Sequence, residues 1–211
     1  MPDPAQNPRL RAAVALAKAS NMGNDTVARA IKRGSGADDG EQYDEMRYEG
    51  YGPGGIAIIV ETLTDNKNRP ASELRKLFDK KGGTLGSPGS VSWNFETRGV
   101  IELPADAIGE EDLMDLVLEA GAEDVKVEDG HLQVLCDPQS FSKVQEAIAS
   151  ANLTPSFAEV ARLPKETVTV DNKKKAIKVL NFIEEVEDHD DVQKVSHNLD
   201  LPPDLLDQIN D

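Results

Sequence analysis

The pattern of apolar residues between positions 99 and 162 restricts the possible folds of this chain more than any other feature. Its centre is the dipeptide Asp129-Gly130, which lies between two alternating apolar and polar runs and is typical of a tight β-hairpin turn. The periodicity on both sides of this turn predicts strands at 100–103, 124–128, 132–136 and 157–162, and helices at 110–120 and 140–151. The resulting order, β-α-β-β-α-β, is that of a ferredoxin-like α/β sandwich.

The segments on either side of this unit carry the elements of a second sandwich. The expected strands are 43–51, 56–63, 90–96, 167–170 and 192–198, and the expected helices are 70–81, 173–187 and a short 203–208. Because the last long helix and strand need a sheet to join, we predict a discontinuous middle domain, residues 41–97 plus 167–211, with the ferredoxin-like domain, residues 98–166, inserted in it. The expected fold class is α+β with three domains, a small helical N-terminal domain and two α/β sandwich domains.

The N-terminal residues 1–37 predict two short helices that form an incomplete helical domain. Asn7 can cap a helix over 8–20, and Asn24 can cap a second helix. Two helices with so few large apolar residues cannot bury a core of their own. This piece therefore either packs on another part of the chain or lacks a segment. The Gly- and Asp-rich residues 34–41 predict a linker after it.

Charge is distributed unevenly along the chain. The total is −16, but residues 1–34 contain six cations and two acids, a net charge of +4, whereas the remainder carries 17 cations and 37 acids, a net charge of −20. This asymmetry favours a polyanion contact at the N-terminal end, although a solvated basic helix pair is the alternative. The candidate nucleic-acid-binding residues of this end are Arg9, Arg11, Lys18, Arg29, Lys32 and Arg33. The last three share a helix face away from the apolar stripe.

A polar loop at residues 65–69 supplies two secondary candidates for the same contact. Lys67 and Arg69 follow a buried strand and precede a helix, and loops on a rigid scaffold often carry function. The alternative is that the loop only caps the helix. The glycine-rich residues 50–55 lead into the apolar strand 56–60 rather than into a helix N-terminus, so they favour a hairpin turn over a phosphate site.

Three apolar residues alternate along the expected strand 90–96. Val91, Trp93 and Phe95 would lie on one face, where they could form a base-stacking platform of the kind found in RNA-binding modules. Since the chain has few aromatic residues, 4% of the total, we expect these side chains to serve the core instead.

The sequence offers no case for an enzyme. The histidines, His131, His189 and His197, have no metal-binding spacing, and the acidic run at 184–191 is favoured as a solvated helix end over a cation site. With Cys136 as the single cysteine, no internal disulfide and no cysteine-based zinc site can form. We expect no cofactor and no metal. The longest aliphatic run, 56–60, is too short for a membrane span and no signal peptide is visible, so we expect a cytoplasmic protein without a membrane partner.

Several blocks of the sequence closely resemble the YebC family. They are residues 48–55 (YEGYGPGG), 61–69 (ETLTDNKNR), 82–86 (GGTLG) and 89–91 (GSV), together with 7–11 (NPRLR) and 21–22 (NM) near the N-terminus. The family includes bacterial proteins described as transcriptional regulators and a mitochondrial translational activator of cytochrome oxidase. The resemblance covers essentially the whole chain.

The resemblance implies three domains with a discontinuous middle one, and a regulator of gene expression rather than an enzyme. It implies DNA binding in some members, and ribosome-associated help with translation, through ribosomal RNA, in others. Family members usually begin with a basic stretch ahead of the helices; it is expected to be missing here, which would remove the strongest polyanion contact. Pro70 stands where the family more often has Thr, which would stiffen that loop.

Overall fold

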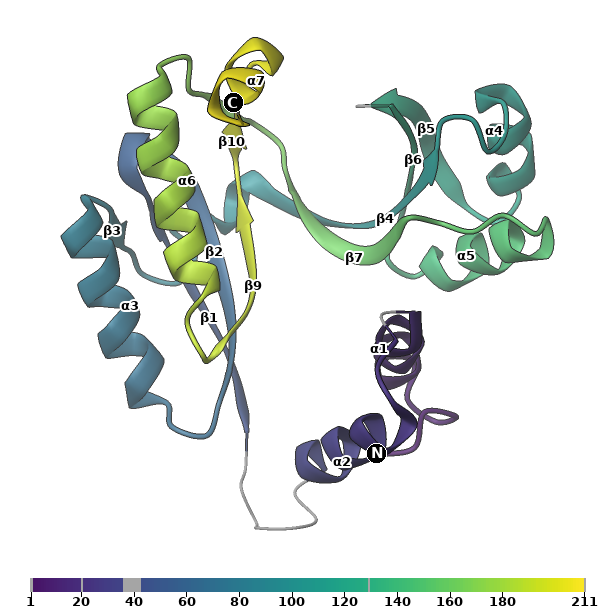
Figure 1. Ribbon diagram of the computed structural model, residues 1–211, viewed down its shortest axis with the longest axis horizontal. Coiled ribbons are helices and arrows are strands. Elements are labelled where there is room, and N and C mark those ends of the chain that lie inside the picture. Colours follow the sequence, from purple (N-terminus) through teal and green to yellow (C-terminus); the bar gives the residue numbers. More distant parts are fainter. Residues whose placement is uncertain (1, 20, 36–42, 129, 211) are drawn as a thin grey trace.

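A computed structural model of the protein describes residues 2–19, 21–35, 43–128 and 130–210 (Figure 1). The chain starts with two helices, α1 (Pro8–Ala19) and α2 (Asn24–Gly34). The amide of Leu10 donates to the side-chain oxygen of Asn7 at 3.2 Å, so the predicted cap of α1 is confirmed. The predicted Asn24 cap of α2 is wrong. The carbonyl of Gly23 accepts the amides of Thr26 and Val27, so the N-cap is Gly23 and Asn24 already lies in the helix.

The first sheet combines strands from both ends of the chain. Its order is β3-β1-β2-β9, with strands Thr84–Leu85, Asp44–Tyr51, Ala57–Thr64 and Val192–His197. All its pairs are antiparallel. The β2–β9 pairing brings the C-terminal strand into the sheet of the first block, as the predicted insertion requires. The domain boundaries themselves stay a prediction.

Two helices, α3 (Asn68–Lys81) and α6 (Lys173–Glu187), cover one face of this sheet (Figure 1). The side chains between helices and sheet form a closed core in which Phe78 and Phe182 meet edge to face, with ring centroids 4.9 Å apart. Because strand side chains alternate, Ile58 and Val60 point to this core while Ile59 packs on the opposite face. Gly82 ends α3 in the left-handed conformation, at φ 83°, as the Gly-Gly pair predicts.

The second sheet has the order β5-β6-β4-β7 and is antiparallel throughout. Its strands are β4 (Phe95–Pro104), β5 (Ala122–Glu128), β6 (His131–Cys136) and β7 (Phe157–Pro164), and its helices are α4 (Glu110–Leu118) and α5 (Phe141–Ser150). A β-α-β-β-α-β chain with this strand order is a ferredoxin-like sandwich, which confirms the predicted fold class. The hairpin turn at Asp129 itself lies outside the described residues.

The long strands β4 and β7 connect the two halves of the molecule (Figure 1). They pair from Phe95 opposite Pro164 to Glu102 opposite Phe157. At one end Phe95 packs on the first sheet, and at the other end Ile101 lies in the core of the second. The two sheets are therefore joined by a continuous antiparallel ribbon rather than by loose linkers.

Short elements complete the fold. The turn η1 (Pro53–Gly55) follows β1, with Gly54 and Gly55 at positive φ, as expected for a hairpin connection. Strands β8 (Val168–Thr169) and β10 (Leu199–Asp200) pair in parallel, and α7 (Pro203–Asn210) packs its Leu205 beside them. No helix in the described part of the chain is long and apolar enough to cross a bilayer.

The predicted strand 90–96 is wrong in its first half. Residues Ser92–Asn94 form a 3-10 turn, η2, and the strand begins at Phe95. The cause is the buried carboxylate of Glu49, which accepts the amides of Val91 and Ser92 at 3.1 and 3.0 Å and so removes them from any strand ladder. Burial opposes ionisation of Glu49, but these amides and that of Gly89 outweigh it and lower its pKa.

Candidate nucleic-acid interface

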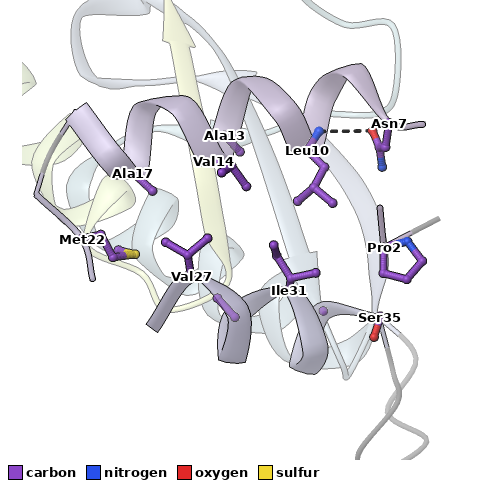
Figure 2. Close-up of a pocket in the computed structure, with 12 residues that line it drawn as sticks. Pro2, Asn7, Leu10, Ala13, Val14, Ala17, Met22, Val27, Ile31 and Ser35 are labelled. Carbon is purple, nitrogen blue, oxygen red and sulfur yellow. Dashed lines mark hydrogen bonds between the residues drawn. The ribbon is translucent and has the colours of Figure 1, made fainter. Parts of the chain in front are cut away.

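The cations of α2 lie opposite its apolar side. Val27 and Ile31 face α1 across a shared groove (Figure 2). At 100° per residue, Arg29, Lys32 and Arg33 fall on the other side of the helix, and all three are exposed. The Arg29 guanidinium donates to the carbonyl of Asp25 and the hydroxyl of Thr26, both at 3.3 Å, so it is positioned along the helix with its charge uncompensated by these partners.

Helix α1 adds two exposed cations on one flank. Arg11 and Lys18 are seven residues apart, two helical turns, and therefore lie one above the other. Arg9 lies in α1 too, but its side chain falls outside the described part of the structure. Within the described residues, the structure records no carboxylate partner for Arg11, Lys18 or Arg33. The side chains of Arg11, Lys18 and Arg33 are thus available to an external anion.

The cations of the two sheets, in contrast, mostly have carboxylate partners. Arg162 bonds to Glu61 at 2.9 Å, Lys194 bonds to Glu159 at 2.5 Å, and Arg98 pairs with Glu96 and Glu123. The first two pairs join β7 to the strands of the first sheet. The Arg162–Glu61 and Lys194–Glu159 pairs therefore link the two sheets.

The secondary candidates Lys67 and Arg69 belong to this paired class. Lys67 lies 3.0 Å from Asp44 on the surface. Arg69 donates through Nε and Nη2 to both oxygens of buried Asp191, at 2.9 and 2.5 Å, and to Asp65 at 2.8 Å. The hydrogen bonds from Arg69 lower the pKa of Asp191, and the same carboxylate raises the pKa of Arg69. Arg69 therefore links the start of α3 to the turn before β9. Because Asp191 and Asp65 neutralise its positive charge, Arg69 is less suited to bind a phosphate.

An open apolar groove separates α1 from α2 (Figure 2). It measures about 600 Å³, and its walls include Leu10, Val14, Met22, Val27 and Ile31. Among the described side chains of the two helices, only Val27 is buried. The sequence-based expectation that this pair cannot close a core by itself agrees with the open groove.

Sequence reasoning assigned Trp93 to the core, and this is wrong. Val91 and Phe95 are buried as expected, but 61% of Trp93 is exposed. The 3-10 turn breaks the alternation that would have put the three side chains on one face. The indole Nε1 of Trp93 donates to the carbonyl of Ser90 at 3.0 Å, and the hydroxyl of Tyr51 donates to the same oxygen at 3.2 Å.

A run of lysines at the start of α6 was also missed. Lys174, Lys175 and Lys178 are exposed, and Lys173 donates to the backbone carbonyl of Gln208. Asn172 caps the helix by accepting the amide of Lys175 at 3.2 Å. Cations at a helix N-terminus oppose the macrodipole, so this placement is not explained by helix stability. The triplet Lys173-Lys174-Lys175 was the signal in the sequence.

The titratable groups give no catalytic arrangement in the part of the chain that the structure describes. No group of three or more His, Cys, Asp or Glu side chains comes together there as a metal site. Burial lowers the pKa of His197 and raises that of the Cys136 thiol. His189 bonds to Glu73 at 2.9 Å on the surface. Among the described residues, no side chain is recorded in a hydrogen bond with half-buried His197 or with the buried Cys136 thiol, so neither has the partner that acid–base or nucleophilic chemistry needs.

The fold and the basic helix pair define a class of α+β proteins in which a small helical segment accompanies a ferredoxin-like unit set into a second sandwich. Comparison with protein families matches the chain in two segments. Residues 43–199 match the TACO1/YebC second and third domain, and residues 1–37 match the TACO1/YebC protein N-terminal domain. The chain belongs to the TACO1/YebC family.

Curated relatives and a solved structure agree with this assignment. A probable transcriptional regulatory protein of Dictyoglomus turgidum is 46% identical over 209 residues, covering 99% of this chain and 84% of that protein. One from Desulfotalea psychrophila is 46% identical over 207 residues, covering 98% and 83%. The crystal structure of a conserved hypothetical protein from Aquifex aeolicus superposes with a TM-score of 0.83 at 41% identity, covering 95% of this chain and 83% of that one.

Proposed function

We propose that this protein is a DNA-binding transcriptional regulator that contacts the phosphate backbone through α1 and α2. The observation that carries the proposal is the contrast in pairing. Arg11, Lys18 and Arg33 have no recorded carboxylate partner among the described residues, whereas Arg69, Arg162 and Lys194 are held by acids. Exposed cations that no acid neutralises are the groups that displace counterions from DNA.

We expect weak DNA-sequence specificity. The exposed cations on α1 and α2 are suited to phosphate oxygens, which fix position on a duplex but carry no sequence information. The acidic remainder of the chain, with a net charge of −20, repels DNA and so orients the protein with its helical end toward the duplex. The names of the curated relatives support a role in transcription.

A salt titration of DNA binding tests this function. Fluorescence anisotropy with labelled duplex DNA is measured over a series of salt concentrations for the wild-type chain, for Arg33→Glu and for Lys143→Glu. Lys143 is an exposed cation of α5 and serves as the control with the same charge change. Arg33→Glu should weaken binding and reduce the slope of log K against log salt by about one unit, while Lys143→Glu should change neither. Equal effects of the two substitutions would contradict a helical interface.

The second candidate function is that of a translation factor that binds ribosomal RNA. The exposed side chain of Trp93 favours it, because unpaired RNA bases stack on aromatic rings. Cosedimentation with ribosomes in a sucrose gradient, kept after polysomes are trimmed to monosomes, would support this function. Protein found only in the light fractions would count against it.

A further inference from the structure

We propose that Tyr51 and Trp93 form a stacking site for an unpaired base of single-stranded RNA, at the junction of the first sheet and the β4–β7 ribbon. The proposal rests on the second candidate function, RNA binding, and names the residues that would hold an unpaired base. It assigns a second contact, on the acidic part of the chain and apart from the cations of α1 and α2. The two contacts recognise different features, unpaired bases and phosphates, and can therefore be tested separately.

The polar atoms of both rings are fixed on one acceptor. Tyr51 Oη and Trp93 Nε1 donate to the carbonyl oxygen of Ser90 at 3.2 and 3.0 Å. With these bonds made, the rings are oriented by the backbone while a large part of each stays open to solvent, 40% of Tyr51 and 61% of Trp93. A preset ring loses little conformational freedom when a base stacks on it.

The loop that carries the acceptor is held rigidly from below. Glu49, whose side chain is almost fully buried, accepts the amides of Val91 and Ser92 on either side of the turn into η2. Val91 is fully buried under the loop. Gly89 adopts φ 90°, a conformation that favours glycine. The backbone turn just before Ser90 therefore depends on the glycine at this position. The position of Trp93 thus follows from buried interactions and not from chance surface exposure.

The exposure of Trp93 is unusual for this chain. Its neighbours Val91 and Phe95 are buried, and the protein has a single tryptophan and only 4% aromatic residues. Burying a side chain of this size would stabilise the fold strongly. Because Tyr51 and Trp93 bond to the same carbonyl oxygen, the two exposed rings lie together instead of being scattered singly, as is typical of surfaces that bind partners.

The backbone of a lysine is bonded to the turn that carries Trp93. The amide of Lys165 donates to the carbonyl of Asn94 at 2.7 Å, so Lys165 lies across the ribbon from the residue after Trp93. Lys165 is exposed, and the structure records no carboxylate partner for it among the described residues. The side chain of Asn94 fixes the same junction by accepting the amide of Glu166 and donating to its carbonyl, at 2.9 and 2.8 Å. Ring faces next to a lysine fit a nucleotide, with the base on the rings and the phosphate on the amine.

The chemistry favours single-stranded RNA over duplex DNA. In a duplex the base faces are already stacked on their neighbours, whereas RNA loops and single strands present open faces that aromatic side chains can cover. No aromatic residue is found in the basic helices α1 and α2, so the stacking site and the phosphate-binding helices have separate ligands.

The single tryptophan allows a direct test. A short oligoadenylate RNA is titrated into the wild-type chain while Trp fluorescence is recorded. The deoxy oligomer and a duplex DNA are titrated in parallel, and binding of all three is followed independently by anisotropy of a labelled strand. Stacking predicts quenching of Trp93 by the RNA. Trp93→Ala and Tyr51→Ala should weaken RNA binding about tenfold each, while Trp93→Phe, which keeps a ring, should weaken it less.

The controls separate this site from the proposed function. Lys143→Glu, on α5 of the second sandwich, should leave RNA binding unchanged, and Trp93→Ala should leave duplex binding unchanged. RNA binding without a change in Trp fluorescence would overturn the stacking site and leave the phosphate contact standing. Tighter binding of the deoxy oligomer would overturn the assignment to RNA. If the wild-type chain does not bind duplex DNA but RNA still quenches Trp93 fluorescence, the proposed DNA-binding function is contradicted and the stacking site is not. Wild-type quenching decides the outcome even if an alanine variant fails to fold.

Discussion

The helix pair α1–α2 and the two-sheet body use charged and apolar side chains in opposite ways. In the body, cations such as Arg69 and Arg162 are bonded to acids, and the apolar side chains close two cores. In the helix pair, Arg11, Lys18 and Arg33 have no recorded acidic partner among the described residues, and the apolar side chains line an open groove.

This difference separates what holds the protein together from what it presents to a partner. Paired surface charges contribute little to net stability, and unpaired cations contribute to binding of anions. The body therefore serves as a folded, acidic scaffold that is stable by its own cores. In the proposed function the helix pair is the contact surface for nucleic acid. Trp93, at 61%, is the most exposed of the large aromatic side chains in the described part of the body.

The largest expected effect comes from the core of the body. Phe182→Ala removes one ring of the buried edge-to-face pair and should lower the free energy of unfolding by about 3–5 kcal/mol. Val27→Ala in α2 should leave the main unfolding transition unchanged, because that transition reports the body. Denaturant unfolding followed by circular dichroism measures both. Similar losses for the two variants would show that the helix pair and the body share one core.

A smaller effect is expected at the Arg69–Asp191 link. Asp191→Asn removes the negative charge of the carboxylate that accepts two hydrogen bonds from the Arg69 guanidinium, and it should lower the free energy of unfolding by about 2 kcal/mol at neutral pH. The control is Asp79→Asn. Asp79 is exposed and lies on α3, the helix that carries Arg69, and its substitution should have little effect on the free energy of unfolding.

The pH dependence of this link has a definite sign. Because the pKa of Asp191 is lowered in the folded state, its stabilisation is present above the ordinary Asp pKa of about 3.9 and is lost as pH falls through the lower folded-state value. Thermal melts between neutral and strongly acid pH should show a steeper loss for the wild type than for Asp191→Asn. Parallel curves would mean that the carboxylate does not depend on Arg69.

His197 should produce a weaker pH effect in the opposite half of the acid range. Burial lowers its folded-state pKa below the ordinary value of about 6.5, so the unfolded chain takes up the proton first as pH falls. Stability should decrease below about pH 6.5 by at most about 1.4 kcal/mol per pH unit. His197→Gln should flatten this limb, whereas the exposed His131→Gln should not. If stability decreases below about pH 6.5 as steeply in His197→Gln as in the wild type, another group causes the decrease.

The smallest effect is expected for Lys67→Ala. Both partners of the Lys67–Asp44 pair are largely in solvent, and such pairs contribute little to folding. The melting temperature should stay within about 1 °C of the wild-type value. The same variant also tests the secondary nucleic-acid candidate, since an unchanged salt slope in the DNA titration would remove Lys67 from the interface.

The elements predicted correctly depend on local patterns. The β-α-β-β-α-β order of the inserted unit followed from alternation and periodicity around Asp129-Gly130, and the end of α3 followed from Gly82. That the C-terminal strand joins the first sheet followed from the need of each strand for a sheet; its pairing with β2 in particular was not predicted.

The elements that were missed depend on contacts between residues far apart in the chain. Glu49 lies 42 residues before Val91, and nothing near residue 91 indicates that a buried carboxylate will take its amide and turn Trp93 outward. Arg69 and Asp191 are separated by 122 residues, so the sequence offered Arg69 as a free cation. The charged residues can be counted from a sequence, but which of them are neutralised by a partner depends on the fold.

Hydrogen exchange of the complete chain with and without duplex DNA tests the division between helix pair and body most directly. We expect slower exchange of backbone amides in α1 and α2 when DNA is added, with the amides of both sheets unchanged, and loss of this protection in Arg33→Glu. Protection confined to the sheets, or protection of α1 and α2 that persists in Arg33→Glu, would contradict the assignment of the helix pair as the contact surface.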